Sequence, residues 1–171
     1  MKNILFGSFF LYMMILLGCS PTRDYYEELS GNYFYRDEGQ ETKEIISHGP
    51  NLNAPYLKDI YGTVIDYDDN SDFIIAIQHP NFEDYKIMVA FNLRDDTVKY
   101  PGSGINDEKS LPVADSILKH DPYFQKIFAH KVNYWIIVHK DKRLYGPLTK
   151  AEFLQKRKEL DVPESLKIKM E

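Results

Sequence analysis

One stretch decides how this chain of 171 residues folds: Asn133-Tyr134-Trp135-Ile136-Ile137-Val138-His139. In an extended strand, successive side chains point to opposite faces of the sheet. Bulky apolar groups occupy both faces here, with Tyr134 and Ile136 on one and Trp135 and Ile137 on the other. A strand that is apolar on both faces is typical of the interior of a sheet. We therefore expect this strand to lie at the structural centre of the domain.

The residues that follow this strand predict a turn and then a helix. Gly146-Pro147 is a dipeptide that often interrupts secondary structure, and we expect the chain to reverse there. Thr149 and Glu152 have the spacing of a capping box, in which two side chains satisfy the first backbone N–H groups of a helix. We expect this helix to extend to about Leu160 and to pack Phe153 against the strand.

Short apolar segments separated by turn residues precede this strand and predict an antiparallel sheet. The run at 72–78 is almost continuously apolar, so we expect a second strand covered on both faces. Apolar residues at helical spacing predict a helix over 110–119, and Asp121-Pro122 predicts the start of another. The remaining expected strands cover 32–36, 41–47, 60–67 and 85–92.

The beginning of the chain predicts an export signal. Lys2 supplies a basic start, residues 4–17 are almost entirely apolar, and small Gly18 precedes Cys19. A helix that spans a membrane needs ~20 apolar residues, which this run does not reach. The motif Leu16-Leu17-Gly18-Cys19 resembles the lipobox of bacterial lipoproteins. That resemblance implies cleavage after Gly18, a diacylglycerol thioether on Cys19 and acylation of the new amino terminus.

Cysteine content agrees with this interpretation. Cys19 is the only cysteine, so no intramolecular disulfide can form, and lipidation gives the unpaired thiol of an exported chain a role. The alternatives are a plain signal peptide with an incidental cysteine, or an uncleaved apolar anchor. We expect residues 1–18 to be the signal, residues 19–29 to be a lipidated tether, and the membrane to be contacted through Cys19. Ser20 resembles the residue that sorts lipoproteins to the outer membrane of the cell envelope.

The part of the chain after the signal suits one acidic α+β domain. Removing residues 1–18 leaves 171 − 18 = 153 residues, with 21 − 1 = 20 basic and 26 acidic side chains, a formal charge of −6. A protein that binds nucleic acid needs a stripe of basic residues on its surface, so we expect no nucleic-acid partner. We predict a single domain over residues 30–171, with an antiparallel sheet of about six to seven strands and two or three helices packed on one face.

Residues 66–72 alternate in the manner of a calcium-binding loop. Oxygen-bearing side chains stand at every second position, but Ser71 occupies the place of the turn glycine and Ile77 the place of the bidentate glutamate. The alternative is a polar hairpin tip, since Asp and Asn are common turn residues. We leave open whether an ion binds to Asp66, Asp68, Asn70 and Asp72.

Histidine and serine patterns predict no catalytic, cofactor or metal residue. The histidines have none of the spacings of known metal motifs. Ser103 lies between two glycines but lacks the strand–turn–helix context of a hydrolase nucleophile. We therefore expect surface positions for His79 and His139. The five histidines are His48, His79, His120, His130 and His139.

Tyrosines near the start of the domain suggest a binding surface. An exposed aromatic platform would suit sugar rings or a partner protein. The alternative is that alternating aromatic residues form cross-strand packing pairs. The candidate platform comprises Tyr25, Tyr26, Tyr33 and Tyr35.

Three motifs stand in the C-terminal half: 133–137 (NYWII), 145–148 (YGPL), and 152–153 (EF) followed by Arg157 through Pro163. Together they resemble a family of small bacterial lipoproteins known only as a domain of unknown function. Residues 64–67 and 73–78 are similar to the middle segment of that family. The resemblance implies export and a single fold over most of the chain after Cys19. It implies no activity and no active residues.

These observations favour a membrane-anchored envelope lipoprotein that is not an enzyme. We expect a monomeric binding or scaffolding module, with a protein or a glycan as its partner and no cofactor. The alternative is a hydrolase acting on cell-envelope material. An enzyme requires a concave site where a base meets an acid or a nucleophile, whereas a binding module requires an exposed apolar or aromatic patch.

Overall fold

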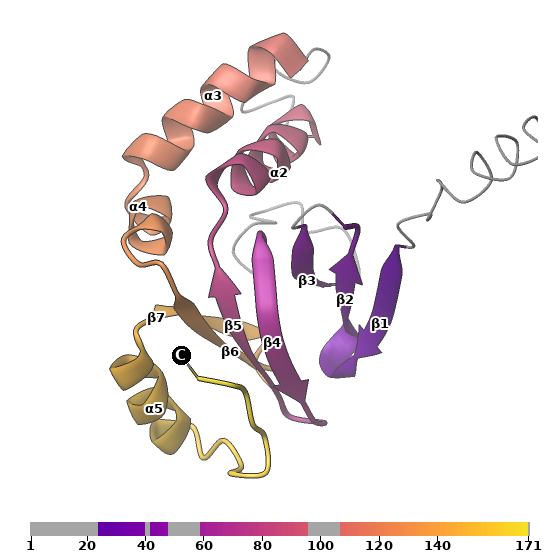
Figure 1. Cartoon of the computed structure of the whole chain (residues 1–171), viewed down its shortest axis with the longest axis vertical. Coiled ribbons are helices and arrows are strands. Elements are labelled where there is room, and N and C mark those ends of the chain that lie inside the picture. The colour runs from indigo at the N-terminus through magenta and orange to yellow at the C-terminus, as the bar shows by residue number, and fades with distance from the viewer. Residues whose placement is uncertain (1–23, 40–41, 48–58, 96–106, 171) are drawn as a thin grey trace, which may run out of the picture.

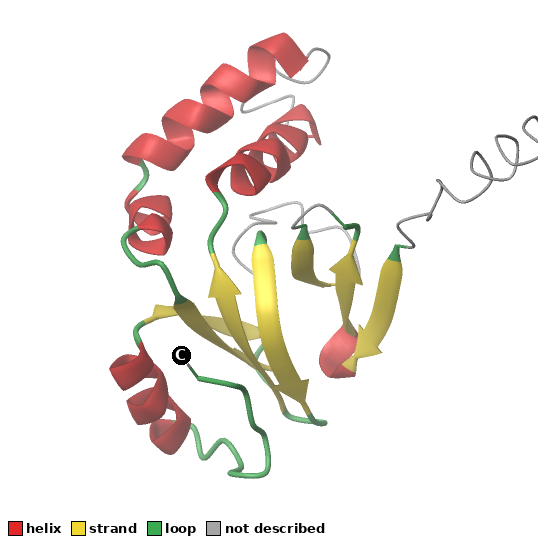
Figure 2. Ribbon diagram, in the orientation of Figure 1, coloured by secondary structure: helices red, strands yellow, loops and turns green. Residues whose placement is uncertain are grey.

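The computed structural model describes residues 24–39, 42–47, 59–95 and 107–170. The predicted signal, the predicted lipid-attachment residue Cys19, and the residues His48 and Ser103 lie outside these ranges. In the described part, one seven-stranded sheet is combined with four α-helices (Figures 1 and 2). The predicted α+β fold class is therefore confirmed.

The strands follow one another across the sheet in chain order, from β1 at one edge to β7 at the other. All neighbours are antiparallel except β3 and β4, which are parallel and share only the register pair Lys43 and Thr63. The strands are β1 (Tyr25–Leu29), β2 (Tyr33–Asp37), β3 (Lys43–Ser47), β4 (Thr63–Asp69), β5 (Phe73–His79), β6 (Asn133–Val138) and β7 (Arg143–Leu148). The helices are the 3-10 turn η1 (Ser30–Asn32), α2 (Phe82–Asp95), α3 (Asp107–His120), α4 (Pro122–Phe128) and α5 (Lys150–Glu159).

Strands β5 and β6 lie inside the sheet and are covered on both faces. Trp135 and Ile137 belong to a core cluster shared with α2, α3 and α4. Tyr134 and Ile136 belong to a second cluster, which includes Phe153 of α5 and the segment after it. The helices thus divide between two faces, whereas the sequence predicted them on one. Strands that are apolar on both sides need two covers, and a single helical layer supplies only one.

Helix α2 corrects the strand expected over 85–92. Tyr85, Val89 and Leu93 are buried at a spacing of four residues, which is the period of one helix face. The side-chain oxygen of Asn81 accepts a hydrogen bond from the backbone N–H of Glu83 at 3.0 Å, as in an N-cap. Acidic residues follow in the first turn, where the helix dipole favours negative charge. The extra helix explains why four are observed and not two or three.

Two further expectations change. Gly146-Pro147 does not reverse the chain but lies inside β7, and Gly146 packs directly on Trp135. The reversal comes earlier, where the N–H of Lys142 bonds to the carbonyl of His139 at 3.3 Å. Residues Tyr25–Leu29, assigned to the tether, form edge strand β1. The predicted capping box is confirmed: Thr149 and Glu152 bond reciprocally at the start of α5.

Candidate functional site

The acidic stretch of β4 holds the C-terminal end of the described chain. A carboxylate oxygen of Asp68 accepts the backbone N–H of Lys167 at 2.7 Å, and one of Asp66 accepts that of Lys169 at 2.6 Å. The side chain of Asn70 accepts the backbone N–H groups of Asp72 and Phe73 within the hairpin tip, both at 2.9 Å. Within the described ranges, no group of three or more His, Cys, Asp or Glu side chains is placed to hold a metal ion.

The described histidines do not form one site. His120 Nδ1 lies 2.7 Å from the carbonyl oxygen of Ser116, on its own helix. His139, for which a surface position is expected, is half-buried: its ring stacks on Tyr33 with centroids 6.2 Å apart, and its Nδ1 lies 2.9 Å from the carbonyl oxygen of Ser71. Its role is to join the β4–β5 turn to the start of β2. The fifth, His48, is outside the described residues.

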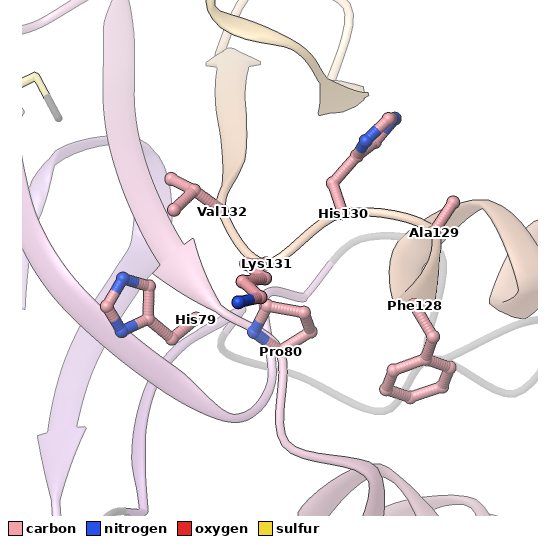
Figure 3. A pocket seen from close by; sticks show the side chains of 7 residues that line it. All are labelled: His79, Pro80, Phe128, Ala129, His130, Lys131 and Val132. Carbon is pink, nitrogen blue, oxygen red and sulfur yellow. The ribbon is translucent and has the colours of Figure 1, made fainter.

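The remaining two histidines line an open hollow of about 590 Å³ between the ends of β5 and α4. Figure 3 shows that the rings of His79 and His130 do not point toward each other, and that Lys131 lies between them near Pro80. Among the described residues, the lining contains no carboxyl group and no hydroxyl nucleophile. The hollow therefore lacks the pairing of base and acid or nucleophile that hydrolysis requires. Its lining is His79, Pro80, Phe128, Ala129, His130, Lys131 and Val132.

Glu44 is a buried carboxyl of β3 whose pKa is shifted upward. Its side chain is 1% exposed and pairs with Arg36, whose Nε lies 2.7 Å from Glu44 Oε1. Burial raises the pKa of the Glu44 carboxyl, although the Arg36 guanidinium opposes the change. A raised carboxyl pKa suits a general acid. With its side chain this deeply buried, however, Glu44 offers substrate almost no access, and we assign it a structural role.

The tyrosines of β1 and β2 separate onto two faces. Cross-strand pairing puts Tyr25, Tyr33 and Tyr35 on one face and Tyr26 on the other, beside Phe34. Tyr33 and Tyr35 are buried, which is the cross-strand packing alternative. Tyr25 and Tyr26 are 51% and 56% exposed. The predicted four-residue platform is thus reduced to two exposed rings at the start of the edge strand.

Glu27 links the exposed ring of Tyr25 to the sheet interior. One of its carboxylate oxygens accepts the hydroxyl of Tyr25 at 2.9 Å and that of Tyr67 at 2.5 Å. The hydrogen bond to Glu27 raises the pKa of Tyr25, and burial followed by the bond to Glu27 raises that of Tyr67. Tyr67 also packs on Tyr35, with ring centroids 4.7 Å apart. The Tyr25 ring is therefore braced by its neighbours and held in place.

We name the exposed pair and its support the aromatic edge: Tyr25, Tyr26, Glu27, Tyr35 and Tyr67. The sequence indicated the tyrosines of β1 and β2 but missed Tyr67, because it lies on β4 and meets Tyr35 across the short strand β3. Side chains alternate between the two faces along β4, and Tyr67 shares a face with Ala76 and Trp135. This alternation is the sequence signal that could have indicated the position of Tyr67.

The comparisons with known proteins concern the end of the chain. Residues 115–171, one third of the sequence, match the model of a family described as Protein of unknown function (DUF3997). This supports the expected resemblance to a domain of unknown function over α4, β6, β7 and α5. No curated protein and no solved structure matches the chain. None of the described helices is both long and apolar enough to span a bilayer.

Proposed function

We propose that the protein is a lipid-anchored lipoprotein of the cell envelope, placed in the outer membrane, whose domain is a non-enzymatic binding or scaffolding module. The observation that carries the anchor is the coincidence, at one position, of the end of an apolar run, a small residue and the sole cysteine: Leu16-Leu17-Gly18-Cys19. Two or three acyl chains at ~0.8 kcal/mol per buried methylene hold a protein durably on a bilayer.

The aromatic edge supports the binding part of the proposal. Two tyrosine rings more than half exposed at the start of an edge strand are the kind of surface that recognises a partner. The hydrolase alternative has less support from the described residues, because those that line the hollow beside His79 and His130 include no acid, and Glu44 is buried. We therefore put the contact surface at the aromatic edge.

The anchor is tested by Cys19→Ser in cells supplied with labelled palmitate. We expect the native chain to take up label and fractionate with membranes, and the variant to remain unprocessed or to be released without label. The conservative Ser20→Ala variant is the matched control and keeps both label and membrane location. Label retained by Cys19→Ser would refute the anchor.

A further inference from the structure

The register of the sheet identifies the end of the molecule from which the anchor departs. Pairing runs across five strands in one row: Tyr25 with Asp37, Asp37 with Lys43, Lys43 with Thr63, and Thr63 with His79. The start of β1 and the end of β5 therefore lie at the same end of the sheet. Helix α2 begins three residues after His79 and stands over this end (Figure 1).

At this end, two of the described elements, β1 and α2, each carry two exposed large apolar side chains. Tyr25 and Tyr26 open β1, and Ile87 and Phe91, one helical turn apart on α2, are 46% and 50% exposed. Tyr25 and Tyr26 point to opposite faces of the sheet, so together they flank the end of the strand. The other large apolar residues with comparable exposure in the described part are single residues on other elements, such as Leu154 on α5.

Two lysines at this end form ion pairs. Lys43 Nζ lies 3.1 Å from a carboxylate oxygen of Asp37 at the ends of β3 and β2. Lys86 pairs with Glu83 on the first turns of α2. Paired charges lower the cost of bringing this surface to a lipid headgroup layer, since neither sign is left in excess at these positions. The formal charge of −6 after the signal favours a zwitterionic surface over a strongly anionic one.

We propose that this end of the domain, through Tyr25, Tyr26, Ile87 and Phe91, lies on the membrane surface, and that a zwitterionic lipid bilayer is the partner of the aromatic edge. The inference rests on the proposed anchor at Cys19. Cys19 and Tyr25 are six residues apart, so the extended chain between them spans at most about 20 Å. A globular partner of 100 residues has a radius of gyration of about 13 Å and does not fit into that space. Tyrosine is also a residue that prefers the membrane–water interface.

The proposal is tested by placing tryptophan at chosen positions and quenching it with brominated lipid. The native chain has one tryptophan, Trp135, which is fully buried and gives a background that lipid does not reach. Tyr26→Trp and Phe91→Trp each add an exposed tryptophan at the anchor end. Leu154→Trp adds one at a site of similar exposure, 40%, on α5, and is the matched control. Full chains are produced in cells, purified from membranes and reconstituted in vesicles of brominated or ordinary phosphatidylcholine.

We expect brominated vesicles to remove the added emission of Tyr26→Trp and Phe91→Trp, and to leave that of Leu154→Trp and of Trp135 unchanged. Equal quenching at all three added positions would show that the domain has no fixed orientation and would overturn the proposal. No quenching at 26 and 91 would also overturn it, and would leave a protein or a glycan as the partner of the aromatic edge.

The mass of the Cys19 peptide, measured on the same samples, tests the anchor separately. If Cys19 carries no lipid, its thiol is the only one in the chain and can be coupled to a maleimide phospholipid before the quenching is repeated. The orientation is then decided whether or not cells lipidate the chain. An unmodified Cys19 with quenching at 26 and 91 refutes the proposed anchor alone, whereas a lipidated Cys19 without quenching refutes the membrane contact alone.

Discussion

The indole Nε1 of Trp135 donates a hydrogen bond of 2.9 Å to Oε1 of Gln78, and both side chains are fully buried. The amide nitrogen of Gln78 in turn donates to the carbonyl of Tyr61 and, at 2.8 Å, to the hydroxyl of Tyr85. One side chain thus satisfies polar groups from β6, from α2 and from the residues before β4. It does so where the sheet meets its helical cover.

Replacing Gln78 with leucine should remove these bonds while nearly preserving side-chain volume. The Trp135 N–H and the Tyr61 carbonyl would then be buried without these partners, so we expect unfolding to become easier by about 2–4 kcal/mol. Urea denaturation measures the change. Gln155→Leu on the exposed side of α5 is the control and should shift stability by less than about 0.5 kcal/mol. Equal stability of the two variants would show that the Gln78 bonds contribute nothing.

Trp135→Ala should destabilise the domain far more than Thr149→Ala. Trp135 is fully buried between β6 and the helices, and such truncations cost about 3–5 kcal/mol. Thr149 caps α5 at an exposed position, and loss of such a cap costs about 1 kcal/mol. Thermal and urea unfolding without any ligand give both values. A stable Trp135→Ala domain would contradict the central place of β6.

Asp66 and Asp68 should hold the C-terminal segment on the sheet. Asp66→Ala combined with Asp68→Ala removes the acceptors of the Lys169 and Lys167 amides, so hydrogen exchange of those amides should accelerate. Asp72→Ala, at the exposed hairpin tip, is the control and should leave both rates unchanged. Adding a chelator to the native domain should also leave them unchanged. Acceleration by chelator would instead make these carboxylates ion ligands.

The unfolding free energy of the domain should depend on pH above pH 9 because Tyr35 is buried. Burial, followed by the charges of Asp37, Tyr25 and Glu27, raises the pKa of Tyr35 from 10.0 to about 12. The folded chain therefore holds the Tyr35 proton more tightly than the unfolded chain. The contribution of this proton to the unfolding free energy is complete below pH 10 and is lost as pH rises through about 12. Two pKa units correspond to about 3 kcal/mol.

Tyr35→Phe removes this titration. The unfolding free energy of the native domain should therefore fall relative to that of the variant as pH rises from 9 toward 12, while their difference stays constant below pH 9. Urea denaturation at a series of pH values follows the difference. A difference that stays flat across the whole range would mean that Tyr35 titrates alike in the folded and unfolded chains.

The parts of the fold set by short-range patterns were predictable, and the rest depended on distant contacts. The apolar runs of β5 and β6, the Asp121 cap and the Thr149 capping box were all visible in the sequence. Helix α2 was missed because residues 85–91 are rich in strand-forming side chains, and tertiary burial of Tyr85 and Val89 decides the outcome.

The candidate site shows the same division. The sequence alone indicated the tyrosines of β1 and β2 as a candidate binding surface, but which of them are exposed depends on β4. Tyr67 covers Tyr35 and bonds to Glu27 from a strand some thirty to forty residues further along the chain. A pattern of neighbouring residues cannot indicate a contact between residues that are so far apart in the chain. The role of Asp66 and Asp68 was hidden for the same reason, since their partners lie about a hundred residues away.

The position of β1 at the sheet edge has a mechanical consequence. With the start of β1 toward the membrane, a pull on the chain through Cys19 would run along β1 from Tyr25 and shear the bonds that β1 makes with β2. Because β1 is bonded along one side only, it has fewer bonds to resist this shear than an inner strand, so it would detach before the rest of the sheet yields. The inner strands β5 and β6, covered on both faces, would stay intact. In an anchored chain, β1 would thus act as a compliant connector that lengthens under tension and re-forms when the tension is released.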